Sequence, residues 1–365
     1  MYLTQSLHRA VQQFPDEIAT ICGDRVRTHR QTADRVARLA GALRALGLAE
    51  GDRVGLLAKN SDRYHEFLCA VWWMGGVVNP VNTRWSAREM AYSLEDSGTR
   101  VLFVDDSFAA RVPELESHWG GISTVVHLGD GDLPAGMLGH RELIDGHEPV
   151  EDVRRGGDAL AGIFYTGGTT GFPKGVMLSH RGILTSTLGM LATARSSRRG
   201  GRLLHVAPLF HLAALGAWNG QSVMGGSHVF LPAFDPAEVL DAIERNQVTN
   251  LLLVPAMIQA LLDHPAIGHH DLSTVEHIGY GASVISEPLL ERAVTAFSGA
   301  RFSQGYGMTE LSPGATVLTG DDHEDKNLLR SAGRATASTE VRIVDEEGRE
   351  APPERWAKWR CAVAA

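Results

Sequence analysis

The sequence contains few cysteines and no apolar run long enough to cross a membrane. Its three cysteines, Cys22, Cys69 and Cys361, are spread over 365 residues, so neither a disulfide framework nor a structural zinc site is expected. The richest apolar run, 251–262, is interrupted by Pro255 and is too short to span a bilayer. The first residues have no signal-peptide core. These absences predict a soluble, cytoplasmic protein without a transmembrane segment.

An excess of basic residues is also missing. The chain has 34 Lys and Arg against 43 Asp and Glu, a formal charge of -9. That charge argues against a nucleic-acid partner, which requires a basic face, but leaves room for one local phosphate site. The length exceeds what one core usually supports, so at least two subdomains are expected.

Helical and strand patterns alternate along the chain, which predicts an α/β fold with largely parallel sheets. Ser86 and Glu89 form a capping box that opens one helix, and Asp235 followed by Pro236 starts another. Residues 105–157 have weaker periodicity and are interpreted as a variable connection. The other predictions are helices over 36–46, 64–74 and 256–262, and strands over 54–57, 101–104, 161–164, 176–178, 251–254 and 275–278.

The most informative segment is 165–175, Tyr-Thr-Gly-Gly-Thr-Thr-Gly-Phe-Pro-Lys-Gly, between two apolar strands. Its glycines let the backbone approach an anion, its threonines add hydroxyl donors, and its lysine adds a positive charge. The spacing is not that of the Walker loop. A flexible surface turn is the alternative. The candidate phosphate-binding residues are Thr166, Gly167, Gly168, Thr169, Thr170, Gly171 and Lys174.

This segment resembles the phosphate-binding motif of the adenylate-forming superfamily, usually Tyr or Ser followed by Thr-Ser-Gly-Thr-Thr-Gly-x-Pro-Lys-Gly. Gly167 stands in place of the usual serine, which removes a hydroxyl donor and is expected to tune nucleotide contacts. The resemblance runs from about residue 14 to residue 344. The other segments that carry it, in family order, are 51–54, 60–61, 78–84, 208–211, 280–283, 304–310 and 333–334.

The resemblance implies the N-terminal domain of an acyl-CoA synthetase, which uses ATP to convert a carboxylic acid, here a fatty acid, to acyl-AMP. The implied fold has two stacked αβ subdomains, roughly 1–160 and 161–330, within an AMP-binding domain over 1–345 that ends in the start of a small β-barrel. The interval 310–333 lacks the insertion of fatty-acyl-AMP ligases, which favours CoA as the acceptor.

The resemblance also assigns catalytic residues. Lys174 is implied to hold the β- and γ-phosphates, Thr309 the α-phosphate, and Glu310 a Mg²⁺ ion, because a hard cation prefers carboxylate and phosphate oxygens. The attacking carboxylate is already ionised, so catalysis requires positioning and charge neutralisation rather than a general base. For Glu310 the alternative is a solvated surface carboxylate.

Adenine is implied to lie against the ring of Tyr306 and the backbone near Gly281, and His211 to line the acyl pocket. A core tyrosine and a structural histidine are the respective alternatives. The implied nucleotide-binding residues of this region are Gly281, Ala282, Ser283, Gly305, Tyr306, Gly307 and Thr309.

The tail, 346–365, does not resemble the family. We therefore interpret the C-terminal domain, with its catalytic lysine, as absent. Because tryptophan has a single codon, the shifted reading frame is partly determined and permits Ala-Val-Gly-Glu-Met-Ala-Leu-Arg-Gly, close to the expected motif. We interpret this as a frameshift near Pro352 or Pro353, and expect impaired activity. The alternative function is a non-catalytic remnant that binds nucleotide or acid.

Overall fold

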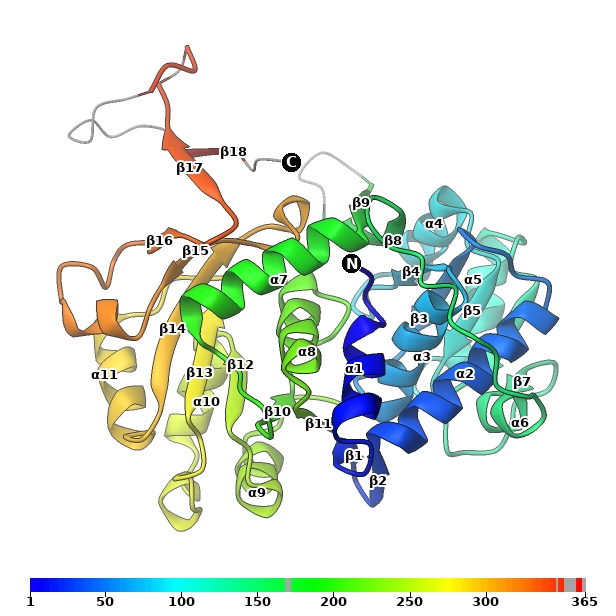
Figure 1. The fold of residues 1–365 in the computed structure, drawn as a ribbon, viewed down its shortest axis with the longest axis horizontal. Coiled ribbons are helices and arrows are strands. Elements are labelled where there is room, and N and C mark those ends of the chain that lie inside the picture. Colours follow the sequence, from blue (N-terminus) through cyan, green and yellow to red (C-terminus); the bar gives the residue numbers. More distant parts are fainter. Residues whose placement is uncertain (168–171, 346, 351–358, 363–365) are drawn as a thin grey trace.

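Two large β-sheets with helices on both faces of each form the body of the protein (Figure 1). The computed structural model describes residues 1–167, 172–345, 347–350 and the backbone of 359–362. The α/β class with mainly parallel sheets is therefore confirmed. Within the described residues, no helix is long and apolar enough to cross a membrane.

The smaller sheet has seven strands and is parallel except for its last strand, which runs antiparallel to its neighbour. Two of its inner strands, Val77–Pro80 and Val101–Val104, are buried along their whole length, as expected where helices cover both faces. In spatial order the strands are β7 (Leu138–Gly139), β6 (Thr124–His127), β5 (Val101–Val104), β3 (Arg53–Leu57), β4 (Val77–Pro80), β8 (Leu160–Thr166) and β9 (Lys174–Ser179).

The larger sheet has nine strands, with a parallel centre and antiparallel strands at its two edges. Each sheet takes strands from both sides of the predicted division near residue 160, because β8 and β9 belong to the smaller sheet and β1 and β2 join the larger one. In spatial order the strands are β16 (Arg334–Ala335), β15 (Gly314–Leu318), β14 (Arg301–Gly307), β13 (His277–Gly281), β12 (Asn250–Leu253), β10 (Arg202–His205), β11 (Ser227–Phe230), β1 (Ile18–Cys22) and β2 (Arg25–Thr28).

The helices form three layers, each with its own apolar core. Helices α1, α2, α3, α7 and α8 share the central core between the sheets, α9, α10 and α11 cover the outer face of the larger sheet, and α4 and α5 cover the smaller one. Their bounds are α1 (Gln5–Gln13), α2 (His29–Ala45), α3 (Asp62–Trp73), α4 (Ala87–Ser97), α5 (Val112–His118), α6 (His140–Asp145), α7 (His180–Ala194), α8 (Leu212–Met224), α9 (Pro236–Asn246), α10 (Pro255–Asp263) and α11 (Glu287–Ala296).

The local signals of the sequence coincide with the element boundaries. Ser86 and Glu89 form both hydrogen bonds of the predicted capping box, and Asp235 accepts from the amides of Ala237 and Glu238 at the start of α9. The interpretation of 105–157 as a variable connection is wrong in part, because this segment contains β6, β7, α5 and α6. These elements are short, so their hydrophobic periods repeat too few times to be recognised.

Buried charges connect the two sheets. Asp62, on α3 of the smaller half, is fully buried and accepts hydrogen bonds from Arg25 and Arg27 on β2 of the larger sheet; Arg25 Nη2 lies 2.8 Å from Asp62 Oδ1. Burial by itself would raise the pKa of Asp62, but the two arginines outweigh it and lower the pKa. This carboxylate is therefore kept ionised between the two halves.

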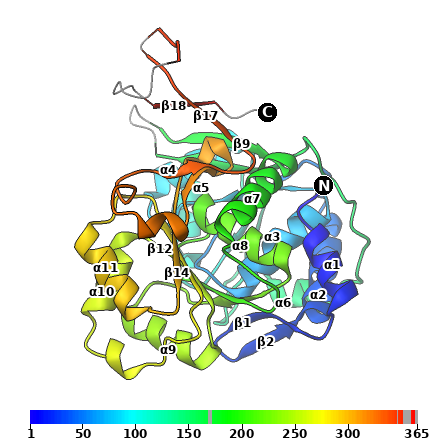
Figure 2. The ribbon, with the colours of Figure 1, turned by 60° about the vertical axis from the view of Figure 1, so that its left-hand side comes forward.

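Beyond the larger sheet, β17 (Glu340–Ile343) and β18 (Trp359–Ala362) pair antiparallel in a separate two-stranded sheet. This sheet projects away from the body in both ribbon views (Figure 2). It stands where the sequence predicts the start of a small β-barrel. Most of the tail interpreted as frameshifted lies outside the described residues.

Candidate functional site

A cavity of about 540 Å³ lies between the larger sheet and the helices α7 and α8. Its walls come from β12, β13 and β14 on the sheet side and from α7 and α8 on the other. The carboxyl ends of the parallel strands contribute Gly281 and Gly305, and the chain continues from β14 into the wall at Met308 and Thr309. Ligands of open α/β sheets characteristically bind at such strand ends. The volume suits a small-molecule ligand.

Alternating small residues make room for this cavity. The residues of β13 that line the cavity include His277, Gly279 and Gly281, and those of the neighbouring β14 include Ser303 and Gly305. Side chains on a strand alternate between faces, so this spacing of two leaves one face of both strands nearly bare. The intervening residues Ile278, Tyr280 and Phe302 belong to the apolar core of the larger sheet.

The backbone at the end of β13 is closely packed. A methyl group on Gly281 would lie 2.4 Å from the carbonyl oxygen of Gly305 on the adjacent strand, so only glycine fits there. The next residue, Ala282, has a φ of 64°, in the left-handed region that non-glycine residues rarely occupy. Strained conformations of this kind often occur at functional sites, where the surrounding structure maintains them.

Predicted site residues from three distant segments meet at this cavity. Tyr306 is 43% exposed, so it is not a core tyrosine. Ser283 and Glu310 are exposed and lie outside the cavity wall. The predicted residues that line the cavity are His211, Gly281, Ala282, Gly305, Tyr306, Gly307 and Thr309.

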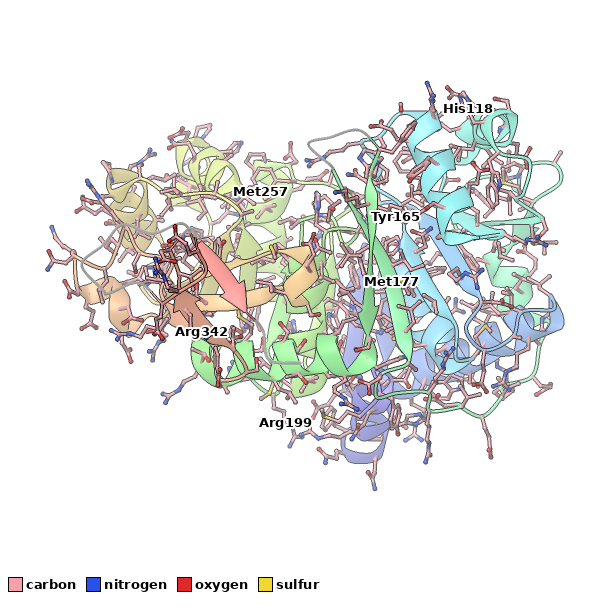
Figure 3. The ribbon with its side chains drawn as sticks, turned by 90° about the horizontal axis from the view of Figure 1, so that it is seen from above. His118, Tyr165, Met177, Arg199, Met257 and Arg342 are labelled. Carbon is pink, nitrogen blue, oxygen red and sulfur yellow. The ribbon has the colours of Figure 1, made fainter. Side chains whose placement is uncertain are left out.

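The predicted phosphate segment connects β8 to β9, an antiparallel hairpin that lies between the two halves of the molecule. Figure 3 shows this hairpin with Tyr165 and Met177 labelled. Thr166 pairs with Lys174 across the ladder, and Gly167 is exposed. The predicted residues Gly168, Thr169, Thr170 and Gly171 lie outside the described residues.

The side chain of Lys174 is exposed and makes no hydrogen bond or ion pair with any residue that the structure describes. Its strand contacts the turn η3 (Thr309–Leu311), which carries Glu310. We call the end of the cavity at Gly281, Gly305 and Thr309 its mouth. The two predicted charged residues belong to adjoining elements, and Glu310 directly follows Thr309, but neither residue lines the cavity itself.

The carboxylate of Glu310 is likewise exposed and without a hydrogen bond or ion pair to the described part of the chain. No cluster of three potential metal ligands occurs among the described residues. Magnesium sites beside phosphates commonly use only one or two protein carboxylates, with the remaining ligands from phosphate and water. Glu310 therefore fits a metal shared with a bound phosphate, and does not fit an all-protein metal site.

His211 occupies the N-cap position of α8, at the edge of the cavity. Its ring lies 4.3 Å from that of Phe210, measured between centroids. The pKa of His211 is lowered, chiefly by desolvation and secondarily by the positive charge of Arg84, so the ring is neutral at pH 7. A neutral imidazole at this edge can contact an uncharged part of a ligand.

Sequence reasoning overlooked several residues of the wall, in particular His277, Gly279 and Ser303. A signal for them exists in the sequence. The patterns His-x-Gly-x-Gly and Ser-x-Gly-x-Gly at 277–281 and 303–307 place small residues on one face of two strands.

Comparison with known proteins identifies the family of the chain. The family model described as AMP-binding enzyme matches residues 7–355. The chain belongs to the AMP-binding enzyme family. It is 35% identical over 355 residues to the fatty acid–[acyl-carrier-protein] ligase ScoC of Streptomyces coeruleorubidus, covering 96% of this chain and 66% of that protein. It is 36% identical to a feruloyl-CoA synthase of Amycolatopsis sp, covering 94% of this chain and 66% of that protein.

Solved structures of AMP-binding enzymes share the fold. The inhibitor-bound N-terminal domain of FACL13 from Mycobacterium tuberculosis superposes with a TM-score of 0.85 at 29% identity, covering 96% of this chain and 86% of that one. A fatty acyl CoA synthetase of the same organism gives a TM-score of 0.84 at 27% identity, covering 96% and 67%. The chain thus spans about two thirds of the length of the curated relatives it matches and most of an N-terminal domain.

Proposed function

We propose that this chain binds ATP and a carboxylic acid, and that it carries the acyl-AMP-forming site of an acyl-CoA ligase. The observation that carries the proposal is the convergence of His211, Gly281 and Tyr306 on one cavity at the carboxyl ends of parallel strands. These residues come from segments far apart in the chain. The ligases among its relatives support acid activation, and their different acids leave the substrate open.

In the proposed reaction, a carboxylate oxygen of the acid attacks the α-phosphorus of ATP. The bond from that phosphorus to the bridging oxygen breaks, and pyrophosphate leaves with the electron pair. Both reactants are anions, so the chief contribution of the protein is to hold them in line and offset their charge. Lys174 would hold the outer phosphates at the end of β9, and Thr309 would donate to the α-phosphate from the cavity wall.

Adenine would lie along the backbone of Gly281 and Ala282, with the partly exposed ring of Tyr306 beside it. The carboxylate of Glu310 would hold Mg²⁺, which when bound to the phosphates reduces the repulsion between the two anions. In the longer proteins of the family the acyl group then passes to a thiol, and we propose CoA as that acceptor.

The experiment has two readouts on the purified chain. Calorimetric titration with ATP and Mg²⁺ measures nucleotide binding, and a pyrophosphate-release assay with fatty and aromatic acids measures adenylation. Binding together with acid-dependent pyrophosphate release supports an adenylating site. Binding without release supports the alternative, a domain that binds nucleotide or acid without turnover. Absence of ATP binding would refute the proposed site.

A further inference from the structure

The far end of the cavity, at the amino ends of β13 and β14, is polar. His277 and Ser303 both face the cavity, and His277 Nε2 lies 2.9 Å from Ser303 Oγ. The rest of the wall is mostly apolar, with contributions from Met190, Leu252 and Met257. The polar pair therefore lies at the end of an apolar passage.

This pair retains unused hydrogen-bonding capacity. Neither side chain makes another hydrogen bond with a described residue. A serine hydroxyl and a neutral imidazole together offer two donors and more than two acceptors, of which their mutual bond consumes one each. In either imidazole tautomer, one donor and at least one acceptor remain available. Both residues are largely buried, with exposed fractions of 8% and 6%, so a ligand inside the cavity is the natural partner for these groups.

The electrostatics of the cavity favour an uncharged partner. Burial lowers the pKa of His277 to about 4, so the ring is neutral at physiological pH. Among the described residues that line the cavity, only Arg84 has a permanently charged side chain, and it adjoins His211 at the mouth. A ligand carboxylate at the far end would thus lose its hydration. The positive charge that acts on His277 there, after burial, is that of Arg301, which lies outside the cavity wall and is paired with Asp321.

The distance from the mouth to the pair is short. The ring atom Cε1 of His277 lies 3.6 Å from where a methyl group on Gly279 would be, so the ring leans toward the mouth. Gly279 and Gly281 are two residues apart on β13, which corresponds to about 7 Å. One aromatic ring with a short linker spans such a distance, whereas a long alkyl chain would have to pass its methylenes along the polar pair.

Resting on the proposed function, we infer that His277 and Ser303 select a carboxylic acid that carries a neutral hydrogen-bonding group at its distal end, of the hydroxyaryl class. The carboxylate of this acid would lie at the mouth and its hydroxyl at the polar pair. The glycines at 279 and 281 leave room for the ring between these two ends.

The test uses stable acyl-adenylate analogues and the full 365-residue chain, so it needs no turnover. Three acylsulfamoyl adenosines are compared by calorimetric titration, carrying 4-hydroxycinnamoyl, cinnamoyl or 4-carboxycinnamoyl groups. The 4-hydroxycinnamoyl analogue should bind about three- to tenfold more tightly than the cinnamoyl one, the net effect of one hydrogen bond. The 4-carboxycinnamoyl analogue should bind most weakly.

In the variant Ser303→Ala, the ratio of the affinities for the 4-hydroxycinnamoyl and cinnamoyl analogues should fall toward one. The affinity for the cinnamoyl analogue should stay nearly unchanged. The matched control is Ser222→Ala, which removes a similar serine–histidine hydrogen bond, to His228 at 3.1 Å, outside the cavity wall. This control should retain the preference. Far-UV circular dichroism and melting temperature verify that both variants fold. The comparison of the three analogues on the wild-type chain does not depend on either variant.

The outcomes separate this inference from the proposed function. Equal binding of the first two analogues by the wild-type chain would overturn the inference and leave the adenylate site intact. Tightest binding of the 4-carboxycinnamoyl analogue would also overturn it, because the far end would then recognise an anion. Failure of all three analogues to bind would refute the proposed function as well.

Discussion

Thr166 and Lys174 form the last register pair of the antiparallel strands β8 and β9. Directly opposed residues of such strands have Cβ atoms about 5 Å apart. The pairing therefore brings both ends of the predicted phosphate segment together and places Lys174 at one of these ends. The strand β9 also contacts the turn η3, which carries Glu310.

From this arrangement we expect Lys174→Ala to weaken ATP binding without destabilising the fold. Two unit charges about 4 Å apart interact by about 4 kcal/mol at an effective dielectric of 20, and solvent reduces this for an exposed side chain. A loss of roughly ten- to a hundredfold in affinity is expected by calorimetry. The control is Lys326→Ala, which replaces another exposed lysine, one that forms an ion pair with Glu291. Unchanged ATP affinity in the Lys174 variant would remove this residue from the site.

The variant Glu310→Gln should abolish the effect of Mg²⁺ on nucleotide binding and leave the melting temperature unchanged. The amide keeps the shape of the side chain but lacks the charge that a hard cation requires. ATP titrations with and without Mg²⁺ measure this effect. Glu324→Gln, in the exposed turn η4 (Asp321–Glu324), should respond to Mg²⁺ like the wild type. An equal response in all three proteins would place the metal elsewhere.

Gly281 and Gly305 provide a matched pair of glycine substitutions. Gly281→Ala should destabilise the protein by about 1–3 kcal/mol, because the added methyl group would lie 2.4 Å from a backbone carbonyl of the next strand. At Gly305 the nearest atom is Met190 Cε at 3.6 Å, an ordinary contact, so Gly305→Ala should fold normally but narrow the cavity. Urea unfolding and ATP titration together test the pair. Similar stabilities of the two variants would contradict the close approach at Gly281.

Restoring the hydroxyl of the family motif should be tolerated at Gly167. A methyl group placed there would meet no atom of the described structure within 4 Å. We expect Gly167→Ser to leave the melting temperature within about one degree of wild type, since exposed substitutions usually change stability by less than about 0.5 kcal/mol. The added donor should tighten ATP binding by about two- to tenfold. Weaker ATP binding would show that the glycine is required for close approach of the nucleotide.

The buried histidines predict a loss of stability in acid. Burial lowers the pKa of His205 to about 3 and that of His65 to about 4, and also lowers that of His228, whose Nδ1 lies 2.9 Å from His205 Nε2. The unfolded state thus binds more protons than the folded state below the ordinary pKa of 6.5, so stability falls as the pH decreases. Between pH 6.5 and 5 the loss is at most about 2 kcal/mol for each such histidine.

Urea unfolding at pH 7 and pH 5 measures this dependence. Because His228→Gln removes one of the titrating groups, its stability should depend less steeply on pH than that of the wild type. The exposed His118, labelled in Figure 3, offers the control His118→Gln, which should keep the wild-type slope. Equal stability of the wild type at both pH values would contradict the prediction.

Local signals in the sequence were sufficient for many elements. The strand at 101–104, the capping box of Ser86 and Glu89, and the start of α9 at Asp235 coincide with the structure. Each depends on residues within a few positions of one another, where propensity and capping act directly. The short elements between 105 and 157 were missed because their patterns repeat too few times.

By itself the sequence determined the fold class, through local pattern, and the family motifs, through residues at fixed spacing. Several residues of the cavity wall followed from the resemblance that those motifs carry. Only the tertiary structure decided how the strands assemble, with β1 pairing with β11 more than two hundred residues later, at Thr20 and His228. It also decided that the mouth continues into a cavity ending at His277 and Ser303. Such pairings arise because distant segments bury each other's surfaces, and that burial is a property of the whole packed chain.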